Sequence, residues 1–192
     1  MKMRIAALCA GTLVAVPLAA APVTYNVDPT HTYPSFAADH MGGLSVWRGK
    51  LRTSSGTIVL DREAKSGTVK IVIDTTAVDV DMDKLNEHIK SADMLDVAKF
   101  PTATYEGTLS KFKNGEPTEV DGNLTLHGVT KPVKLTINTF LCKQNPMSHK
   151  DVCGADASAT INREDFGVSY GKAYGFLMDV KLQIQVEAIK AD

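Results

Sequence analysis

The sequence has few aromatic residues and little excess charge, and both shortages narrow what the protein can be. Phe, Trp and Tyr make up 6% of the 192 residues, with a single Trp. A formal net charge of −1 at pH 7 offers no basic surface for nucleic acid or an anionic membrane. After the first twenty residues, no apolar run approaches the ~20 residues that cross a bilayer. We therefore expect one soluble domain with no nucleic-acid partner.

Catalytic and metal-binding motifs are also scarce. No H-E-x-x-H motif is present and no histidine pair has zinc-site spacing, although five histidines occur: His31, His40, His88, His127 and His149. We expect His127, next to Gly128, to hydrogen-bond a turn, and His88 to lie on the surface or at an interface. These features favour a protein with no catalytic residues, metal site or cofactor.

The N-terminal segment is typical of a signal peptide. Lys2 and Arg4 precede an uncharged apolar run at residues 5–16, and small residues follow at 19–21. The run is too short for a transmembrane helix, which is the alternative. We predict export and cleavage near Ala20. Loss of the two basic residues would leave 19 basic against 22 acidic side chains, a net charge of −3.

Cysteine is nearly absent, with three residues, of which Cys9 lies in the predicted signal peptide. Cys142 and Cys153 remain, with ten residues between them. In an oxidising compartment such a pair predicts a disulfide worth roughly 2–3 kcal/mol. A metal site or redox pair is the alternative, but there is no C-x-x-C spacing and His149 is the one histidine between the cysteines.

Alternation with period two dominates the rest of the chain. Apolar residues alternate with polar ones over residues 176–186, 69–73 and 133–137, which is typical of strands with one dry face. Asn114-Gly115, Asp121-Gly122, and Gly128 with Pro132 predict turns. This pattern predicts an antiparallel sandwich or barrel.

One segment departs from the alternating pattern, and a further strand follows it. Helical spacing of apolar residues predicts one short helix over residues 83–93. Pro101 ends this region, and a strand is expected over residues 102–109.

Small residues on the dry faces bear on whether the interior is hollow. Ala155, Ala157 and Ala159 precede Ile161 on one face of a strand. Alanine side chains that point inward occupy little of the barrel interior and therefore favour a cavity. They can equally match larger residues on the opposite wall, so the pattern leaves both interpretations open.

Three polar residues are candidates for contact with a ligand. His40 shares parity with Phe36 and Ala38, which places it on the inner face as a headgroup contact or a structural histidine. Arg163 and Asp165 are two apart on a strand-like segment and would point to the same side. They could form an ion pair that locks the strand end. Alternatively, Arg163 could bind a phosphate or quinone oxygen.

Specific sequence motifs resemble the polyisoprenoid-binding (YceI-like) family of bacterial periplasmic proteins. The resemblance spans residues 24–189 and rests on these strings in order: Tyr25-Asn26-Val27-Asp28, His31-Thr32, Gly56-Thr57-Ile58, His88-Ile89-Lys90-Ser91-Ala92-Asp93, Lys99-Phe100-Pro101, Gly122-Asn123-Leu124-Thr125-Leu126-His127-Gly128 and Ile161-Asn162-Arg163-Glu164-Asp165-Phe166-Gly167. The chain departs from the family at Leu85-Asn86, where Arg-Asp is frequent. A role for that charged pair cannot be carried over.

The resemblance implies an eight-stranded antiparallel lipocalin-like barrel over residues 21–192, with one short inserted helix. It implies a periplasmic carrier or storage protein that binds an isoprenoid lipid, either a polyprenyl phosphate or an isoprenoid quinone. The expected ligand-binding residues are Phe36, Ala38, His40, Ile71, Ile73, Ala157, Ala159, Ile161, Arg163 and Phe166. A protein-binding module or inhibitor without a lipid is the alternative, and a homodimer is left open.

Overall fold

The structure, a computed structural model, describes residues 21–192, so the predicted signal peptide lies outside the described residues. Its strands are β1 (Val23–Val27), β2 (Tyr33–His40), β3 (Ser45–Leu51), β4 (Ser54–Asp61), β5 (Ser66–Asp74), β6 (Val78–Asp79), β7 (Thr102–Ser110), β8 (Glu119–Leu126), β9 (Val129–Gln144), β10 (Asp151–Asn162) and β11 (Asp179–Lys190). Helix α1 (Asp83–Lys90) and the 3-10 helices η1 (Thr75–Ala77), η2 (Arg163–Phe166) and η3 (Lys172–Tyr174) connect them. No helix within residues 21–192 is long and apolar enough to cross a membrane.

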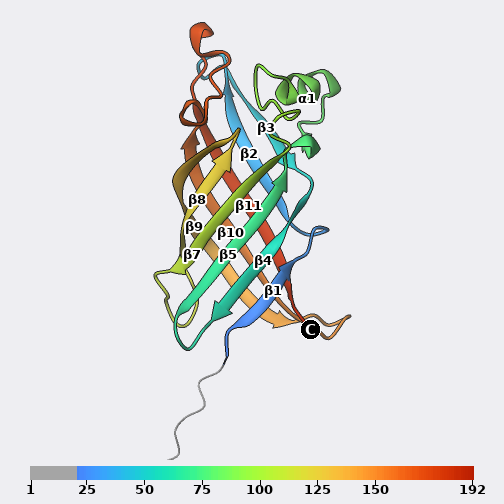
Figure 1. Cartoon of the computed structure of the whole chain (residues 1–192), viewed down its shortest axis with the longest axis vertical. Helices are drawn as coiled ribbons and strands as arrows, with labels where there is room; N and C mark the ends of the chain where they lie inside the picture. Colours follow the sequence, from blue (N-terminus) through green and yellow to red (C-terminus); the bar gives the residue numbers. More distant parts are fainter. Residues whose placement is uncertain (1–20) are drawn as a thin grey trace, which may run out of the picture.

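Eight strands close into a barrel. Each pairs antiparallel with the next in the order β1-β4-β5-β7-β8-β9-β10-β11, and β11 pairs back with β1. Strands β2, β3 and β6 extend the sheet from the other part of β11, at the end that carries α1 (Figure 1). We call this the upper end, and the end near the C-terminus the lower end. The predicted barrel with one short helix is confirmed.

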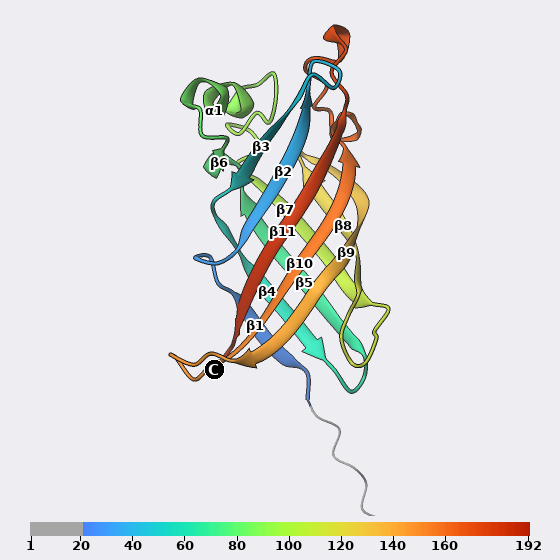
Figure 2. The same cartoon turned by 180° about the vertical axis from the view of Figure 1, so that it is seen from behind.

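The barrel wall is interrupted where β1 gives way to β2. Both strands pair with β11, and residues 28–32 separate them. The Thr32 hydroxyl donates to the Glu187 carbonyl (3.1 Å) and accepts from the Glu187 N–H (3.2 Å). The side chain thereby replaces ladder hydrogen bonds at the break, so no buried backbone group of Glu187 is left unpaired. The view from behind shows β2 rising beside β11 above this point (Figure 2).

Helix α1 lies at the upper end and is shorter than predicted. It ends at Lys90 rather than at Asp93, because the Ser91 hydroxyl donates to the His88 carbonyl (2.7 Å) and closes the last turn. Ile89 is its buried residue and packs with Val78 and Val80. The helix therefore covers part of the upper barrel opening with a small apolar cluster of its own.

One predicted turn is wrong for a clear reason. Asp121-Gly122 lies inside β8, where Gly122 faces Gly107 on β7. A Cβ atom at Gly122 would stand 2.5 Å from Cζ of Tyr105, whose hydroxyl donates to the Val133 carbonyl (2.8 Å). Glycine is present here because an aromatic ring crosses its Cα, not because the chain reverses.

The other turn signals fare better. Asn114-Gly115 forms the β7–β8 turn, with positive φ at both residues (53° and 80°), as predicted. The reversal before β9 falls at His127-Gly128 (φ 51° and 74°). Pro132, assigned to that turn from the sequence, lies within β9.

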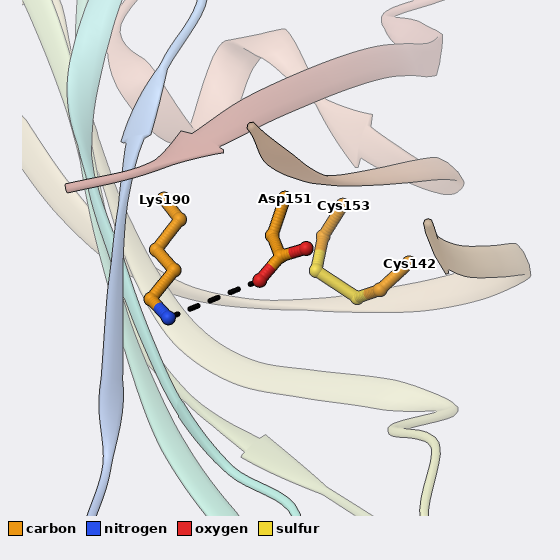
Figure 3. Close-up of a disulfide and its surroundings, with 4 residues drawn as sticks. All are labelled: Cys142, Asp151, Cys153 and Lys190. Atoms are coloured by element: carbon orange, nitrogen blue, oxygen red, sulfur yellow. Dashed lines mark ion pairs between the residues drawn. A yellow bond between two sulfur atoms is a disulfide. The ribbon is translucent and has the colours of Figure 1, made fainter. Parts of the chain in front are cut away.

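The predicted disulfide is present at the lower end. Cys142 on β9 and Cys153 on β10 are directly opposed, with their Cα atoms 4.0 Å apart. Beside it, an ion pair joins Asp151 to Lys190 across β10 and β11 (3.8 Å; Figure 3). The cross-link therefore joins neighbouring strands of the wall near the chain's end.

Candidate functional site

Two apolar cavities lie one above the other inside the barrel. The upper has a volume of about 430 Å³, within the range of pockets that hold small-molecule ligands. The lower has a volume of about 120 Å³. Strand β11 shows the stacking, because Val180 and Leu182 line the upper cavity while Ile184 and Val186 line the lower one. The choice between a filled and a hollow barrel is thereby resolved in favour of a hollow one.

Most of the ten residues expected at the site face one cavity or the other. The upper cavity is lined by Phe36, Ala38, His40, Ile161 and Arg163. The lower cavity is lined by Ile71, Ile73 and Ala157. The expected residues are therefore brought together in two groups at different heights.

Ala159 and Phe166 line neither cavity. On β10, Ala159 lies between Ala157 of the lower cavity and Ile161 of the upper one. It is opposite Leu182 in the ladder and packs against the core. Phe166 is 2% exposed within the core, so we correct its expected position from cavity wall to packing residue.

His127 holds the Phe166 segment in place. Its Nδ1 donates to the Phe166 carbonyl (3.1 Å), and its ring stands edge-on to Phe100 at 4.7 Å between centroids. The sequence prediction that His127 bonds its own turn is therefore replaced by a long-range contact. This contact joins the β8–β9 turn to η2, and its role is structural.

Arg163 places a buried charge at the upper cavity. It is 9% exposed, and its guanidinium donates to the carbonyls of Val168 (2.9 Å) and Tyr170 (2.6 Å). These bonds use two of the five N–H groups of an arginine. Burial lowers the pKa of Arg163, against the opposing influence of Asp39 and Glu164. A buried cation that faces a cavity favours an electron-rich ligand group there.

The expected pairing of Arg163 with Asp165 is wrong. The two residues lie on the 3-10 helix η2 rather than on a strand. Arg163 therefore points inward, whereas Asp165 is exposed, and no ion pair joins them among the ion pairs of residues 21–192. Residues two apart point to the same side of a strand, but they point to different sides of a 3-10 helix, which has three residues per turn.

Aromatic rings surround the upper cavity in two groups. His40 stands edge-on to Trp47 (5.8 Å between centroids) and to Phe176 (5.4 Å). His88, expected on the surface, lines the cavity and contacts Tyr170 (4.5 Å). Sequence reasoning missed Trp47, Tyr170 and Phe176. Alternation along β3 could have indicated Trp47. Phe176 was expected to begin a strand over residues 176–186, but β11 begins at Asp179 and Phe176 lies on the preceding loop; Tyr170 lies on a loop without a period.

Asp39 joins two loops beside the upper cavity. Its carboxylate accepts hydrogen bonds from the N–H groups of Gly42 (2.8 Å), Gly43 (2.6 Å) and Leu177 (2.9 Å). The bond from Leu177 is the leading cause that lowers the pKa of Asp39, with those from both glycines adding to it. The β2–β3 turn is thus tied to the loop that precedes β11.

Residues 167–171 (Gly-Val-Ser-Tyr-Gly) have the letter pattern of a hydrolase nucleophile elbow. An elbow needs a sharp turn from a strand into a helix, whereas this segment links the short 3-10 helices η2 and η3. Ser169 is exposed, and no hydrogen bond from a histidine to its hydroxyl is found in residues 21–192. The same part of the chain contains no cluster of three or more His, Cys, Asp or Glu residues suited to a metal.

The fold and the cavities define a class of protein, the lipocalin-like barrels that enclose a ligand in an apolar interior. Within it, the chain belongs to the YceI-like family, whose domain model matches residues 25–188. A UPF0312 protein of Pseudomonas aeruginosa (strain LESB58) is 32% identical over 193 residues, which cover 99% of each chain. Protein YceI of Salmonella arizonae is 34% identical over 171 residues, or 86% of each chain.

Solved structures share the fold at lower identity. BcnA from Burkholderia cenocepacia superimposes with a TM-score of 0.66 at 20% identity, over 84% of this chain and 99% of that one. A polyisoprenoid-binding domain from Saccharophagus degradans gives 0.62 at 15% identity, over 88% and 99%. At such identities the likeness extends to the fold alone.

Proposed function

We propose that the protein binds a long-chain isoprenoid lipid inside its barrel and serves as a periplasmic carrier or storage protein. The observation that carries the proposal is the pair of stacked apolar cavities with a buried cation at the upper one. Burial of each CH₂ group is worth ~0.8 kcal/mol, so an isoprenoid tail in water needs such an enclosure. The polyisoprenoid-binding domain with the same fold supports this ligand class.

The parts of the barrel suggest how the ligand lies. The tail would occupy the upper cavity and extend downward past Ala159 toward Ala157. The headgroup would lie near Arg163, whose remaining N–H groups suit the oxygens of a phosphate or a quinone. The apolar N-terminal run and the Cys142–Cys153 disulfide support an exported, oxidised protein.

Mass spectrometry tests the proposal directly. The protein is purified from its own host without detergent, and an organic extract is analysed. We expect an isoprenoid in near-stoichiometric amount, whose headgroup decides between a polyprenyl phosphate and a quinone. Trace lipid together with no uptake of added polyprenyl phosphate would contradict the proposal and favour a protein-binding role.

A further inference from the structure

Two segments at the upper end expose apolar side chains and contain no charged residue, and Lys172, which adjoins the second segment, is paired with Glu164. Residues 41–47 (Met-Gly-Gly-Leu-Ser-Val-Trp) and 173–178 (Ala-Tyr-Gly-Phe-Leu-Met) lack any Asp, Glu, Lys or Arg. Met41 is 55% exposed, Leu44 74%, Tyr174 75% and Leu177 58%. We call these four side chains the apolar rim. Exposed apolar clusters of this kind mark interaction sites more often than isolated residues do.

The two loops form one continuous surface. Asp39 binds the N–H groups of Gly42 and Gly43 in one loop and of Leu177 in the other. An added Cβ at Gly42 would stand 3.0 Å from the Gly175 carbonyl. Both loops project together from the top of the barrel (Figures 1 and 2).

The apolar rim borders the upper cavity. Asp39, which fastens the loops, lines that cavity, and so do Trp47 on β3, next to the first loop, and Phe176 of the second. Met82 and Tyr170 also line it and are 47% and 43% exposed, so the cavity reaches the surface at this end. Whatever contacts the rim therefore lies beside the ligand's entrance.

Loops at the lower end have a different chemistry. Residues 61–65 (Asp-Arg-Glu-Ala-Lys) and 111–116 (Lys-Phe-Lys-Asn-Gly-Glu) are charged, and Lys150 and Asp151 follow Met147 in the β9–β10 turn. Met147 is 87% exposed and Leu141 58%. These two side chains match the rim in exposure but lie at the end away from the upper cavity, which makes them a control.

We propose that the apolar rim docks on a lipid bilayer by shallow insertion of its side chains, so that the ligand passes between membrane and cavity. This inference rests on the proposed function, since an isoprenoid lipid resides in a bilayer before it is carried. Tyr is enriched at membrane–water interfaces, and interfacial segments insert ~5–10 Å. Four side chains on two loop tips are few for a specific protein interface, which involves ~20–30 residues a side.

Vesicle flotation tests the proposal with the whole protein. Phosphatidylcholine vesicles are mixed with wild type, with the rim variant Leu44→Ser/Tyr174→Ser, and with the control Leu141→Ser/Met147→Ser. We expect wild type and control to float alike and the rim variant to partition at least about tenfold more weakly. Because the four rim side chains are uncharged and the neighbouring Lys172 is paired with Glu164, higher salt should change wild-type partitioning by less than about twofold.

Three results would overturn the docking proposal: wild type that does not float, a rim variant that floats like the control, or wild type that floats only with anionic lipid at low salt. If the rim variant instead turns a dimer into a monomer in sedimentation velocity, a second copy is the occupant and the proposal fails.

Uptake of polyprenyl phosphate added from ethanol separates docking from ligand binding. Normal uptake by the rim variant shows that it is folded and that its defect lies in docking. A wild type that floats but takes up no lipid refutes the proposed function and leaves the docking surface standing.

Discussion

The two ends of the barrel differ in construction. At the lower end, long paired strands enclose a cavity of about 120 Å³, a disulfide joins β9 to β10, and charged turns face the solvent. At the upper end, α1 and three 3-10 helices replace regular wall, and the cavity measures about 430 Å³. The upper turn between β2 and β3 is uncharged, and residues 167–178 before β11 contain a single charged residue, Lys172, paired with Glu164.

Because of this difference, the lower end should contribute more of the stability and the upper end more of the ligand binding. Regular ladders and a cross-link satisfy backbone groups and restrict the unfolded chain. The wall is also interrupted beside the lower cavity, where the Thr32 side chain replaces ladder hydrogen bonds of Glu187. Variants at each end should therefore separate stability from ligand binding.

The largest loss of stability is expected for Gly122→Ala in the lower half. The added Cβ would meet the ring of Tyr105 at 2.5 Å and displace its hydroxyl from the Val133 carbonyl. Overpacking together with a lost buried hydrogen bond should lower the free energy of unfolding by about 3 kcal/mol. Urea denaturation measures it. As control, Gly115→Ala has open space around its Cβ and should cost about 1 kcal/mol; equal losses would contradict the role of the Tyr105 ring.

Removal of the disulfide should cost slightly less. Cys142→Ser/Cys153→Ser frees a short loop, for which the chain-entropy model gives roughly 2–3 kcal/mol. Because the bond lies at the lower end, uptake of polyprenyl phosphate should stay within about twofold of wild type. Thiol labelling of unfolded wild type checks that both cysteines are bonded. Cys153 lines the lower cavity, so lost uptake with a preserved fold would show that the cross-link itself, and not only the cavity wall, is needed for the tail to bind.

At the upper end, Arg163→Met should change ligand preference and also lower stability, because the carbonyls of Val168 and Tyr170 lose their donor. Loss of the guanidinium should weaken binding of polyprenyl phosphate by about tenfold or more, the size of one charge-assisted hydrogen bond. Binding of the uncharged polyprenol of equal length should change much less. Fluorescence titration gives the ratio of the affinities for the two ligands. A general loosening of η2 would weaken both affinities alike and leave this ratio unchanged. An unchanged ratio therefore places the headgroup elsewhere.

Sequence periodicity predicted an antiparallel sandwich or barrel because its cause is local, and the family resemblance then chose the barrel. An alternating strand needs one dry and one wet face, so residues such as Val180, Leu182 and Ile184 reveal the inner wall by parity alone. The cysteine pair was likewise predictable from its number and spacing. Turn residues were less informative. Gly122 was expected in a turn, but it lies in a strand, where it leaves room for the Tyr105 ring of the neighbouring strand.

The upper cavity was predicted only in part, because it depends on loops. Arg163 and Asp165 take opposite sides once the chain enters η2, and no local pattern in the sequence announces that change. Trp47, Phe176 and Tyr170 reach the cavity through contacts between distant segments. Small residues on the dry faces left a filled and a hollow interior both open, and they did not indicate the division at the height of Ala159.

The smallest effect on stability is expected for Ala157→Phe, which tests whether the two cavities act as one tunnel. Ala157 is 5% exposed and lines the lower cavity, opposite Ile137 and Ile184. A phenyl group there would fill existing space, so the free energy of unfolding should change by less than about 1 kcal/mol. Ala103→Phe is the control, because Ala103 is 3% exposed and lines neither cavity. Its overpacking should cost about 1–3 kcal/mol.

Ligand length gives the decisive readout for Ala157→Phe. If a long tail passes Ala159 into the lower cavity, the variant should bind a long polyprenyl phosphate about fivefold more weakly, which is ~1 kcal/mol of lost burial. A short isoprenyl phosphate, held in the upper cavity alone, should bind as it does to wild type. Equal affinity of wild type and variant for both lengths would show that the lower cavity stays empty. The upper cavity, with Arg163 at its wall, would then hold the whole ligand.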